Sequence, residues 1–246
     1  MRLIRRNVNM IPKIIHYCWF GGNEKSPLIK RCIESWKIFC PDYEIKEWNE
    51  SNFDVNCNAY VKKAYEMKKW AFVADYARFY VLYQYGGVYL DTDVQLVKNI
   101  DELRLKGKFA GFGNDETVST GLILATEKND WLCKKVMDTY IGEEFVWDDP
   151  SKILAIGRRV TRILIDSGLK PNGQMQMVQD YTIYPKYYFN PTDGDIRGKV
   201  DERAYSIHHY AATWFSPKDK FKNTLRRFVG HRNIERWHKV KALIKK

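Results

Sequence analysis

The sequence contains no long hydrophobic run. Nowhere in its 246 residues does an apolar stretch approach the length of a membrane-spanning helix, about eighteen residues. The first part of the chain carries Arg2, Arg5, Arg6 and Lys13 between short apolar stretches, without the apolar region and small-residue cleavage site of a secretory signal. We therefore expect a protein that neither spans a membrane nor leaves the cell by a standard signal.

Cysteine is also scarce. The odd number of cysteines and the lack of a C-x-x-C pair exclude a disulfide framework and a paired-cysteine zinc site; the residues are Cys18, Cys32, Cys40, Cys57 and Cys133. Reduced thiols predict a cytoplasmic location. Internal repeats and low-complexity linkers are lacking as well. With 45% apolar and 15% aromatic residues the chain can bury a full core, so we expect one main domain.

Acidic residues are few at one end of the chain only. Residues 217–246 contain eleven Lys and Arg against two acidic residues, which puts +9 of the net charge of +11 in this segment. Apolar residues recur there at helical intervals. The pattern predicts a basic amphipathic helical tail on an anionic membrane surface, peripheral to the cytoplasmic face. The alternative is a helix packed on the domain with a solvated basic face. No recognised motif accompanies the charge, so no nucleic-acid partner is expected.

The order of predicted elements indicates an α/β domain over residues 10–216, after an N-terminal extension over residues 1–9. Hydrophobic periodicity and glycine breaks set the elements. In chain order these are a strand over 11–20, a helix over 27–39, a strand over 44–48, a helical segment over 59–85, strands over 88–90, 109–112 and 121–125, helices over 130–141 and 154–164, and short strands and loops after 173. We expect His16, in the first strand, to be a satisfied core histidine.

Two charged residues interrupt the apolar helical segment. Asp75 and Arg78 are three positions apart, so they share one face of a helix that is apolar on nearly every side. An unpaired buried charge costs several kcal/mol, roughly. The two residues therefore form either an internal ion pair or part of a polar site.

We expect the site of the protein's chemistry, which binds a metal and a diphosphate, at Asp91-Thr92-Asp93. A D-x-D triplet alone says little, and Asp193-Gly194-Asp195 has the same spelling in a polar turn. The first triplet differs because an apolar strand after Gly86-Gly87 delivers it to a strand end, where open α/β sheets place ligand sites. Carboxylates suit Mg²⁺ or Mn²⁺, whose remaining ligands come from substrate phosphates. The pair is therefore suited to a metal-diphosphate.

Three motifs in order carry a resemblance to a known family. They are I-P-K-I-I-H-Y-C-W-F-G-G at 11–22, A-D-x-x-R-x(7)-G-G-x-Y-x-D-x-D from 74 to 93, and H-H-Y-A-A-T-W at 208–214. Together they resemble glycosyltransferase family thirty-two, which includes bacterial capsule and lipopolysaccharide transferases and yeast initiating mannosyltransferases. That family is related to the glucosyltransferase domains of the large clostridial toxins. Ala212 and Thr213 depart from its usual Gly-Ser.

The resemblance implies a GT-A-like fold with a central mixed sheet flanked by helices. It also implies a divalent metal and a retaining transfer of a hexose from a nucleotide-sugar, UDP-hexose favoured and GDP-mannose the alternative. The implied acceptor is a saccharide or a polyprenyl-linked saccharide, in bacterial surface polysaccharide synthesis.

Roles follow from the resemblance position by position. The implied catalytic residues are Asp75, Arg78, Asp91 and Asp93, and the implied donor-binding residues are Tyr17, Trp19, Asp75, Arg78, Asp91 and Trp214. Asp93 and His209 are the implied metal ligands, with Asp91 acting through a water. Two alternatives stay open: Trp19 can be a core residue, and His208 can replace His209, because neighbours on an extended segment face opposite ways. Ser119, Thr120 and Gly121 are weaker candidates near the acceptor.

The retaining mechanism lacks an identified nucleophile. Asp180, Asp115 and Glu116 are available carboxylates, but nothing in their spacing places them beneath the sugar. We therefore expect front-side attack, in which the leaving phosphate helps to deprotonate the acceptor.

Two other functions compete with glycosyl transfer. Val88 to Val94 also fits the strand and D-x-D pattern of haloacid-dehalogenase phosphatases, in which Asp91 would be the nucleophile and Asp93 a general acid. That family places the motif near its N-terminus, whereas here ninety residues precede it. The other competitor is a non-catalytic sugar-binding or membrane-binding module.

Overall fold

The computed structural model of the chain describes residues 10–147, 154–192 and 200–211. The chain divides into two units, residues 1–209 and residues 210–246. Several predicted features lie outside the described residues: the extension at 1–9, the second D-x-D triplet at 193–195, Trp214, and the tail at 217–246. The domain boundary at 216 stays a prediction.

The first elements form a strand, helix, strand unit, as predicted. Strand β1 spans Ile14–Cys18, helix α1 spans Pro27–Phe39 and strand β2 spans Glu44–Trp48. Helix α1 starts where the Ser26 side chain accepts a hydrogen bond from the backbone N–H of Ile29, followed by a proline at the first helical position. Strands β1 and β2 are parallel, so their carboxyl ends lie at the same edge of the sheet.

The continuous helical pattern over 59–85 is two helices in the structure. Helix α2 spans Ala59–Glu66 and helix α3 spans Trp70–Tyr85. The break lies at Lys68, whose φ of 57° is left-handed and cannot continue an α-helix. The apolar periodicity does not mark this turn. The residue type does not mark it either, because lysine is not a residue that usually adopts the left-handed conformation. Helix α3 ends at Gly86, as predicted, with a φ of 65° that favours glycine.

A seven-stranded mixed sheet forms the centre of the first unit, with the order β2-β1-β3-β6-β5-β8-β7. Its further strands are β3 at Gly87–Tyr89, β5 at Lys108–Gly111, β6 at Leu124–Thr126, β7 at Gln176–Val178 and β8 at Tyr181–Tyr184. Strand β3 is parallel to β1 and antiparallel to β6. A second sheet pairs β4 at Val94–Leu96 with β9 at Ser206–His208. This pairing brings the residues that follow the DXD triplet next to a segment more than a hundred residues further along the chain.

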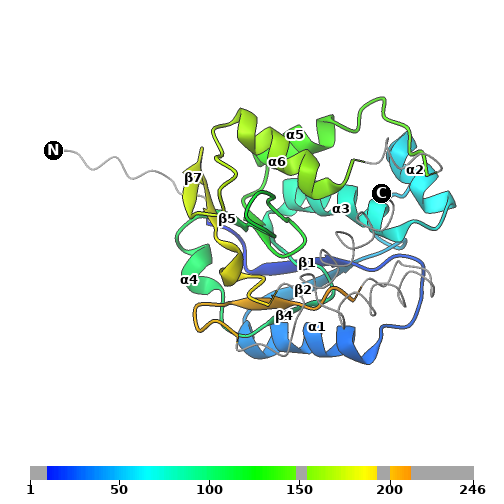
Figure 1. Cartoon of the computed structure of the whole chain (residues 1–246). Helices are drawn as coiled ribbons and strands as arrows, with labels where there is room; N and C mark the ends of the chain where they lie inside the picture. Colours follow the sequence, from blue (N-terminus) through cyan, green and yellow to red (C-terminus); the bar gives the residue numbers. More distant parts are fainter. Residues whose placement is uncertain (1–9, 148–153, 193–199, 212–246) are drawn as a thin grey trace, which may run out of the picture. The chain divides into compact units, whose positions relative to one another are not determined.

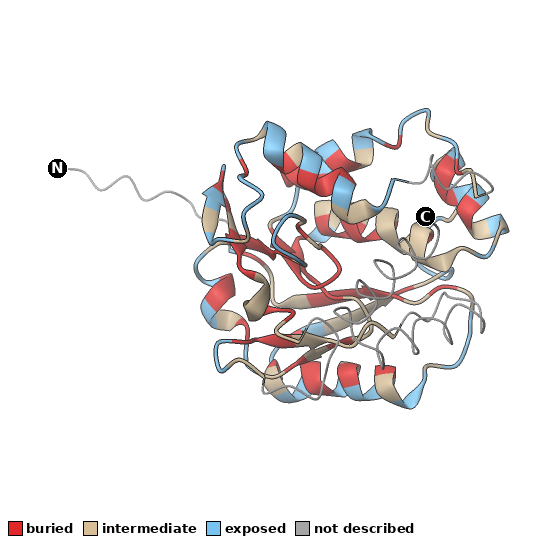
Figure 2. Cartoon of the chain, viewed as in Figure 1, coloured by how far each residue is buried: buried red, intermediate tan, exposed pale blue. Residues whose placement is uncertain are grey.

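Helices cover both faces of the large sheet (Figure 1). Helix α1 lies on one face, while α3, α5 (Trp131–Asp138) and α6 (Ile156–Asp166) lie on the other. A short helix, α4, spans Asp101–Arg104, and a 3₁₀ turn spans Lys186–Tyr188. Burial is greatest on the strands and on the helix sides that face them (Figure 2). The α/β fold with a mixed sheet between helices is therefore confirmed.

The sheet separates two hydrophobic clusters because side chains alternate along each strand. On β1 and β3, Ile15 and Val88 belong to the cluster under α1, whereas Cys18 and Tyr89 belong to the cluster under α3. All five cysteines lie in described residues and have free thiols. Among the described residues, no helix is both long and apolar enough to cross a bilayer.

His16 is a buried, fully hydrogen-bonded histidine, as predicted. Its Nε2 lies 2.8 Å from the carbonyl oxygen of Gly86, and its Nδ1 accepts a hydrogen bond from the indole N–H of Trp48 at 3.0 Å. These partners require the neutral ring that carries its proton on Nε2. Burial lowers the pKa of His16 to about 4.

Acid is therefore expected to destabilise the fold through His16. His16 is neutral in the folded protein at neutral pH, whereas a histidine in the unfolded chain titrates near pH 6.5. Its contribution to the free energy of unfolding is therefore complete above pH 6.5 and is lost as the pH falls toward 4. The loss is about 3 kcal/mol. Asp75 acts in the opposite direction, because its pKa is raised to about 6. The test is urea unfolding of the wild type and His16→Gln between pH 7 and pH 4; a stability difference that does not change with pH would contradict the expectation.

Candidate active site

The site lies where strand β3 ends. Leu90 donates its N–H to the carbonyl of His16 at 3.1 Å, and Asp91 donates its N–H to the carbonyl of Gly121 at 2.9 Å. A Cβ atom on Gly121 would lie 1.9 Å from Oδ2 of Asp91, so a side chain at that position would displace the carboxylate. Gly121, predicted near the acceptor, therefore packs against Asp91.

Three potential metal ligands converge after the strand. Asp91, Asp93 and His208 each offer an oxygen or nitrogen atom, and these atoms lie within 4.8 Å of one another. His208 Nε2 lies 3.1 Å from Oδ1 of Asp93. The pairing of β4 with β9 sets Val94 opposite His208, which brings the two ends of this cluster together across more than a hundred residues of chain.

His209 points elsewhere. Its Nε2 lies 2.9 Å from Oε1 of Gln95, and its backbone N–H donates to the carbonyl of Asp93 at 3.0 Å. Burial lowers the pKa of His209. The preferred sequence prediction was His209, but the geometry favours the alternative, His208. The physical reason is the alternation of side chains at the end of β9.

The chemistry of the three ligands fits a divalent cation. Two carboxylates and one imidazole match the oxygen and nitrogen preferences of Mn²⁺, and carboxylates alone suit Mg²⁺. All three residues are half-buried, so substrate phosphates can reach the cluster. Asp91 and Asp93 thus lie close together, and the role of Asp93 as a metal ligand stays a prediction.

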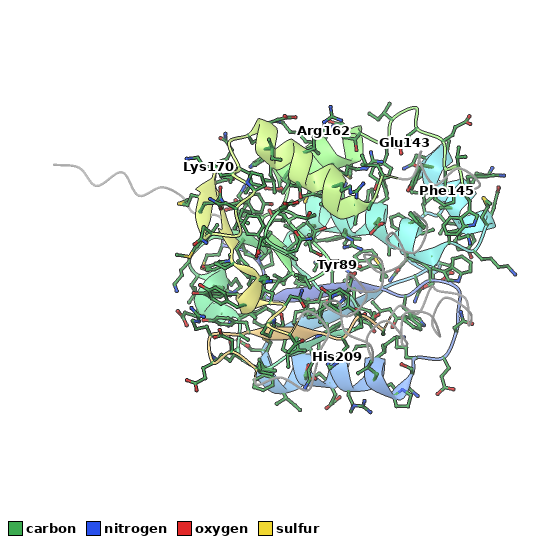
Figure 3. The ribbon with its side chains drawn as sticks, in the orientation of Figure 1. Tyr89, Glu143, Phe145, Arg162, Lys170 and His209 are labelled. Carbon is green, nitrogen blue, oxygen red and sulfur yellow. The ribbon has the colours of Figure 1, made fainter. Side chains whose placement is uncertain are left out.

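Arg78 links helix α3 to this cluster. Its guanidinium lies 2.7 Å from Oδ1 of Asp75 and 3.3 Å from Oδ1 of Asp91, over the ring of Tyr89. Burial raises the pKa of Asp75 to about 6, although the charge of Arg78 opposes the shift. The internal ion pair and the polar site, which were alternatives in the sequence, are one arrangement. Tyr89, labelled in Figure 3, is the last residue of β3 in the large sheet, and His209, also labelled, directly follows β9 of the small sheet.

The aromatic residues predicted to bind the donor lie beside the carboxyl ends of β1 and β2. Trp19 is half-buried against the cluster under α1, and its indole N–H donates to the carbonyl of Asn23 at 2.7 Å. Tyr17 is buried, and its hydroxyl donates to Glu47 at 2.5 Å. Lys25 and Glu47, which the sequence did not single out, join this group. The parallel pairing of Glu47 with Tyr17 places Glu47 here, and no motif in the sequence marked it.

Other candidate carboxylates lie in separate interactions. Asp180 accepts from Lys108 at 2.5 Å and from the indole of Trp131 at 2.8 Å. Lys108 also contacts buried Asp130, the residue that caps helix α5. Asp180 is thus part of an ion-pair network that anchors α5 to the sheet.

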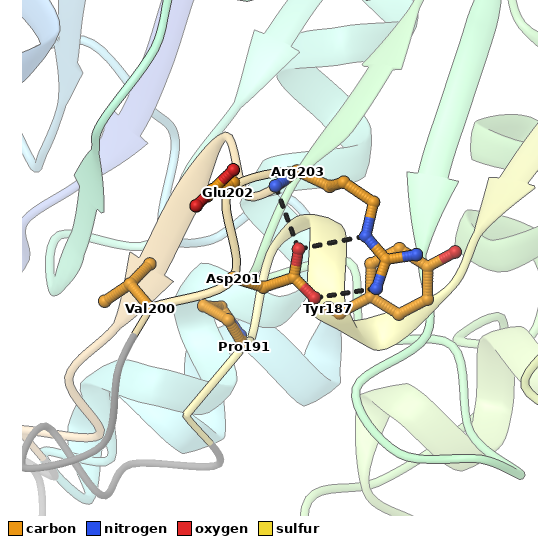
Figure 4. Close-up of a pocket in the computed structure, with 6 residues that line it drawn as sticks. All are labelled: Tyr187, Pro191, Val200, Asp201, Glu202 and Arg203. Carbon is orange, nitrogen blue, oxygen red and sulfur yellow. Dashed lines mark hydrogen bonds and ion pairs between the residues drawn. The ribbon is translucent and has the colours of Figure 1, made fainter.

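A hollow of about 560 Å³ opens on another part of the domain (Figure 4). Its walls include Tyr187, Asp201 and Arg203, and the Arg203 guanidinium is paired with Asp201 and stacked on the Tyr187 ring. None of the DXD, Arg78 or Trp19 residues lines it. The site is therefore defined by its side-chain chemistry and not by this hollow.

The α/β fold with an acidic strand end is the arrangement that the sequence resemblance implies. Residues 26–110 match the family described as "Glycosyltransferase sugar-binding region containing DXD motif". The resemblance found in the sequence is confirmed over this segment, which contains the DXD triplet. The phosphatase alternative has no support from these comparisons.

The curated relatives are similar over part of the chain. Inositol phosphoceramide mannosyltransferase 3 of Schizosaccharomyces pombe is 31% identical over 104 residues, which cover 38% of this chain and 27% of that protein. An uncharacterized glycosyltransferase of Acanthamoeba polyphaga mimivirus is 34% identical over 113 residues, covering 42% of this chain and 41% of that protein. The chain thus spans less than half the length of these relatives. Among solved structures, PaToxG glycosyltransferase is 20% identical with a TM-score of 0.51, covering 64% of this chain and 70% of that one, which shows a shared fold.

We expect metal affinity to distinguish His208 from the adjacent His209. His208→Ala is expected to raise the Mn²⁺ concentration for half-maximal binding by about tenfold to a hundredfold, because a nitrogen ligand is lost. His209→Ala removes only the contact with Gln95 and serves as the matched control. Mn²⁺ titration followed by electron paramagnetic resonance measures both variants. A large effect of His209→Ala with little effect of His208→Ala would restore the sequence prediction.

Proposed function

We propose that this chain is a metal-dependent retaining glycosyltransferase that moves a hexose from a nucleotide-sugar to a saccharide or polyprenyl-linked acceptor. One observation carries the proposal: Asp91, Asp93 and His208 converge within 4.8 Å at the end of a central strand, next to a buried Arg78. A nucleotide-sugar presents a diphosphate to a metal and a sugar to polar side chains, and this arrangement offers both partners.

The residues of the chain take distinct roles in the proposal. Asp91, Asp93 and His208 would hold Mn²⁺ or Mg²⁺, which when bound neutralises charge on the leaving diphosphate. Asp75 and Arg78 would bind the sugar hydroxyls and the phosphate side, held by the ion pairs described above. Gly121 leaves the space that the Asp91 carboxylate occupies.

The acceptor is expected to attack from the side of the leaving group. Asp180 is tied to Lys108 and Trp131, which leaves it no place as a nucleophile in the proposed site. Front-side attack needs no protein nucleophile, because the leaving phosphate accepts the proton of the acceptor hydroxyl. Trapping of a covalent glycosyl-enzyme by mass spectrometry would contradict this route.

A panel of nucleotide-sugars tests the proposal directly. The purified chain is incubated with UDP- and GDP-hexoses plus Mn²⁺ or Mg²⁺, and released nucleoside diphosphate is measured with and without a chelator. We expect release from at least one donor that stops on chelation and resumes when Mn²⁺ is restored. Release that ignores the chelator, or hydrolysis of a generic phosphate ester alone, would defeat the proposal. Absence of release in every mixture would favour a non-catalytic module.

The proposed setting is bacterial surface polysaccharide synthesis at the cytoplasmic face of a membrane. Its support is the basic amphipathic pattern of residues 217–246. The mannosyltransferase names of two relatives belong to those proteins, and a hexose donor is the corresponding proposal here.

A further inference from the structure

We infer that Glu47 and Lys25 read the base of the nucleotide donor and select guanine. The inference rests on the proposed function and specifies its donor. It starts from a charged pair outside the metal cluster: Lys25 Nζ lies 2.8 Å from Oε2 of Glu47. The sequence prediction favoured a uridine donor, so the structure changes the expected nucleotide.

The pair lies at the edge of the sheet where the site is. Glu47 precedes the last residue of β2, and its partner in the parallel register is Tyr17 on β1. Strand β3, which leads to Asp91, is also parallel to β1, so the carboxyl ends of all three strands share one edge. Arg78 and Asp75 reach the cluster from α3, on the other side of the sheet from α1. The aromatic residues on the α1 side thus remain for the nucleoside.

A flat surface for a base is present beside the pair. The Trp19 ring is held by the hydrogen bond from its indole to Asn23 and is only half-buried. Lys25 Nζ lies 5.3 Å from the centre of the Trp19 ring and 5.9 Å from that of Tyr17. A base that stacks on an aromatic ring leaves its hydrogen-bonding edge free for neighbouring side chains. Lys25 is the neighbour that contacts both the rings and Glu47.

Glu47 is a carboxylate built to accept hydrogen bonds. Burial tends to raise the pKa of its carboxyl, but the hydrogen bonds that it accepts outweigh this effect and lower the pKa. Tyr17 and Lys25 donate to Oε2, and Asn49 donates to Oε1 at 3.1 Å. A carboxylate has about four acceptor positions. Among the described residues, Oε1 accepts only from Asn49, so it keeps a second acceptor position. If Lys25 turns to a ligand, Oε2 gains an available acceptor position as well.

Guanine alone among the common bases offers two adjacent donors beside an acceptor. Its N1–H and N2–H₂ groups can donate to the two oxygens of Glu47, while its O6 accepts from the Lys25 ammonium. Uracil places one N–H between two carbonyls, so a carboxylate there would face a carbonyl oxygen. Adenine and cytosine each turn a ring nitrogen acceptor toward it. A bidentate pair of this kind discriminates by about 1–3 kcal/mol, roughly tenfold to a hundredfold in affinity.

The pair is accessible enough to meet a ligand. The Lys25 and Glu47 side chains are 22% and 30% exposed. An ion pair formed for stability alone would contribute little at this exposure. Lys25 lies near two aromatic rings, and Glu47 has acceptor capacity that its present partners do not use. Both features favour a role in recognition.

The test is calorimetric binding of GDP, UDP, ADP and CDP to the full chain with Mn²⁺. We expect GDP to bind wild type at least about tenfold more tightly than the other three. Glu47→Gln should weaken GDP by about tenfold to a hundredfold and leave UDP little changed. Lys25→Met should weaken GDP by a smaller factor. Glu44→Gln, an exposed acid at the other end of β2, is the matched control and should bind as wild type.

The outcomes separate this inference from the proposed function. Equal binding of GDP and UDP by wild type, or an equal loss of all four nucleotides in Glu47→Gln, would overturn base selection and leave the transferase proposal standing. No binding of any of the four with Mn²⁺ would overturn both. Thermal unfolding of each variant shows that the fold is retained, and Lys25→Met reports on the pair if Glu47→Gln is unstable.

Discussion

Asp93→Asn is expected to lower metal-dependent release of nucleoside diphosphate by about a hundredfold to a thousandfold. The change removes a negative charge from the cluster that Asp91, Asp93 and His208 form among the described residues, yet keeps the shape of the side chain. The backbone carbonyl of Asp93, which accepts from the N–H of His209, is unaffected. We therefore expect the loss to appear in the rate at saturating donor and in Mn²⁺ affinity, with unfolding little changed.

A matched control comes from the second D-x-D triplet. Asp195→Asn makes the same chemical change in Asp193-Gly194-Asp195, which is predicted to be a turn without a metal. Wild-type rates are expected for this variant. A comparable loss in both variants, or nearly full activity of Asp93→Asn with unchanged Mn²⁺ dependence, would remove Asp93 from the metal site.

Arg78→Met is expected to destabilise the fold by about 3–5 kcal/mol as well as abolish activity. Methionine fills much of the volume, but the buried Asp75 carboxylate loses its partner at 2.7 Å. Because burial already raises the pKa of Asp75 to about 6, the variant should hold this group protonated at neutral pH. Asp91 also loses a neighbouring positive charge at 3.3 Å. Urea unfolding measures the stability, and nucleotide release measures the activity.

Two further variants show whether the cost lies in the buried pair. Arg203→Met makes the same substitution in an exposed pair with Asp201, where the loss of stability should be small. Adding Asp75→Asn to Arg78→Met should restore part of the stability, because a neutral amide avoids the cost of protonating the buried carboxyl on folding. If the double variant is less stable than Arg78→Met, the loss comes from packing of the arginine side chain.

The sequence predicted most of the elements around the site because their signals are local. The apolar spacing of helix α1, the glycine that ends α3 and the apolar strand before Asp91 depend on residues a few positions apart. The same signals failed at Lys68, where the continuous apolar pattern hid a left-handed turn between α2 and α3.

The candidate site likewise has parts that the sequence predicted and parts that it did not. The resemblance to a glycosyltransferase family came from three motifs in order, each of which lies within one short segment of the chain. The choice between His208 and His209 depended on the pairing of β4 with β9, and a one-residue change would exchange their directions. Lys25 and Glu47 had no motif to mark them.

By itself, then, the sequence determined the α/β class, the DXD strand end and the shared helix face of Asp75 and Arg78, because their residues are close along the chain. Only the tertiary structure decided that Arg78 also reaches Asp91, that His208 faces Asp93, and that Glu47 lies beside Tyr17 and Lys25. These contacts join segments separated by many residues. Their geometry is set by strand register and side-chain alternation, which a list of residues does not contain.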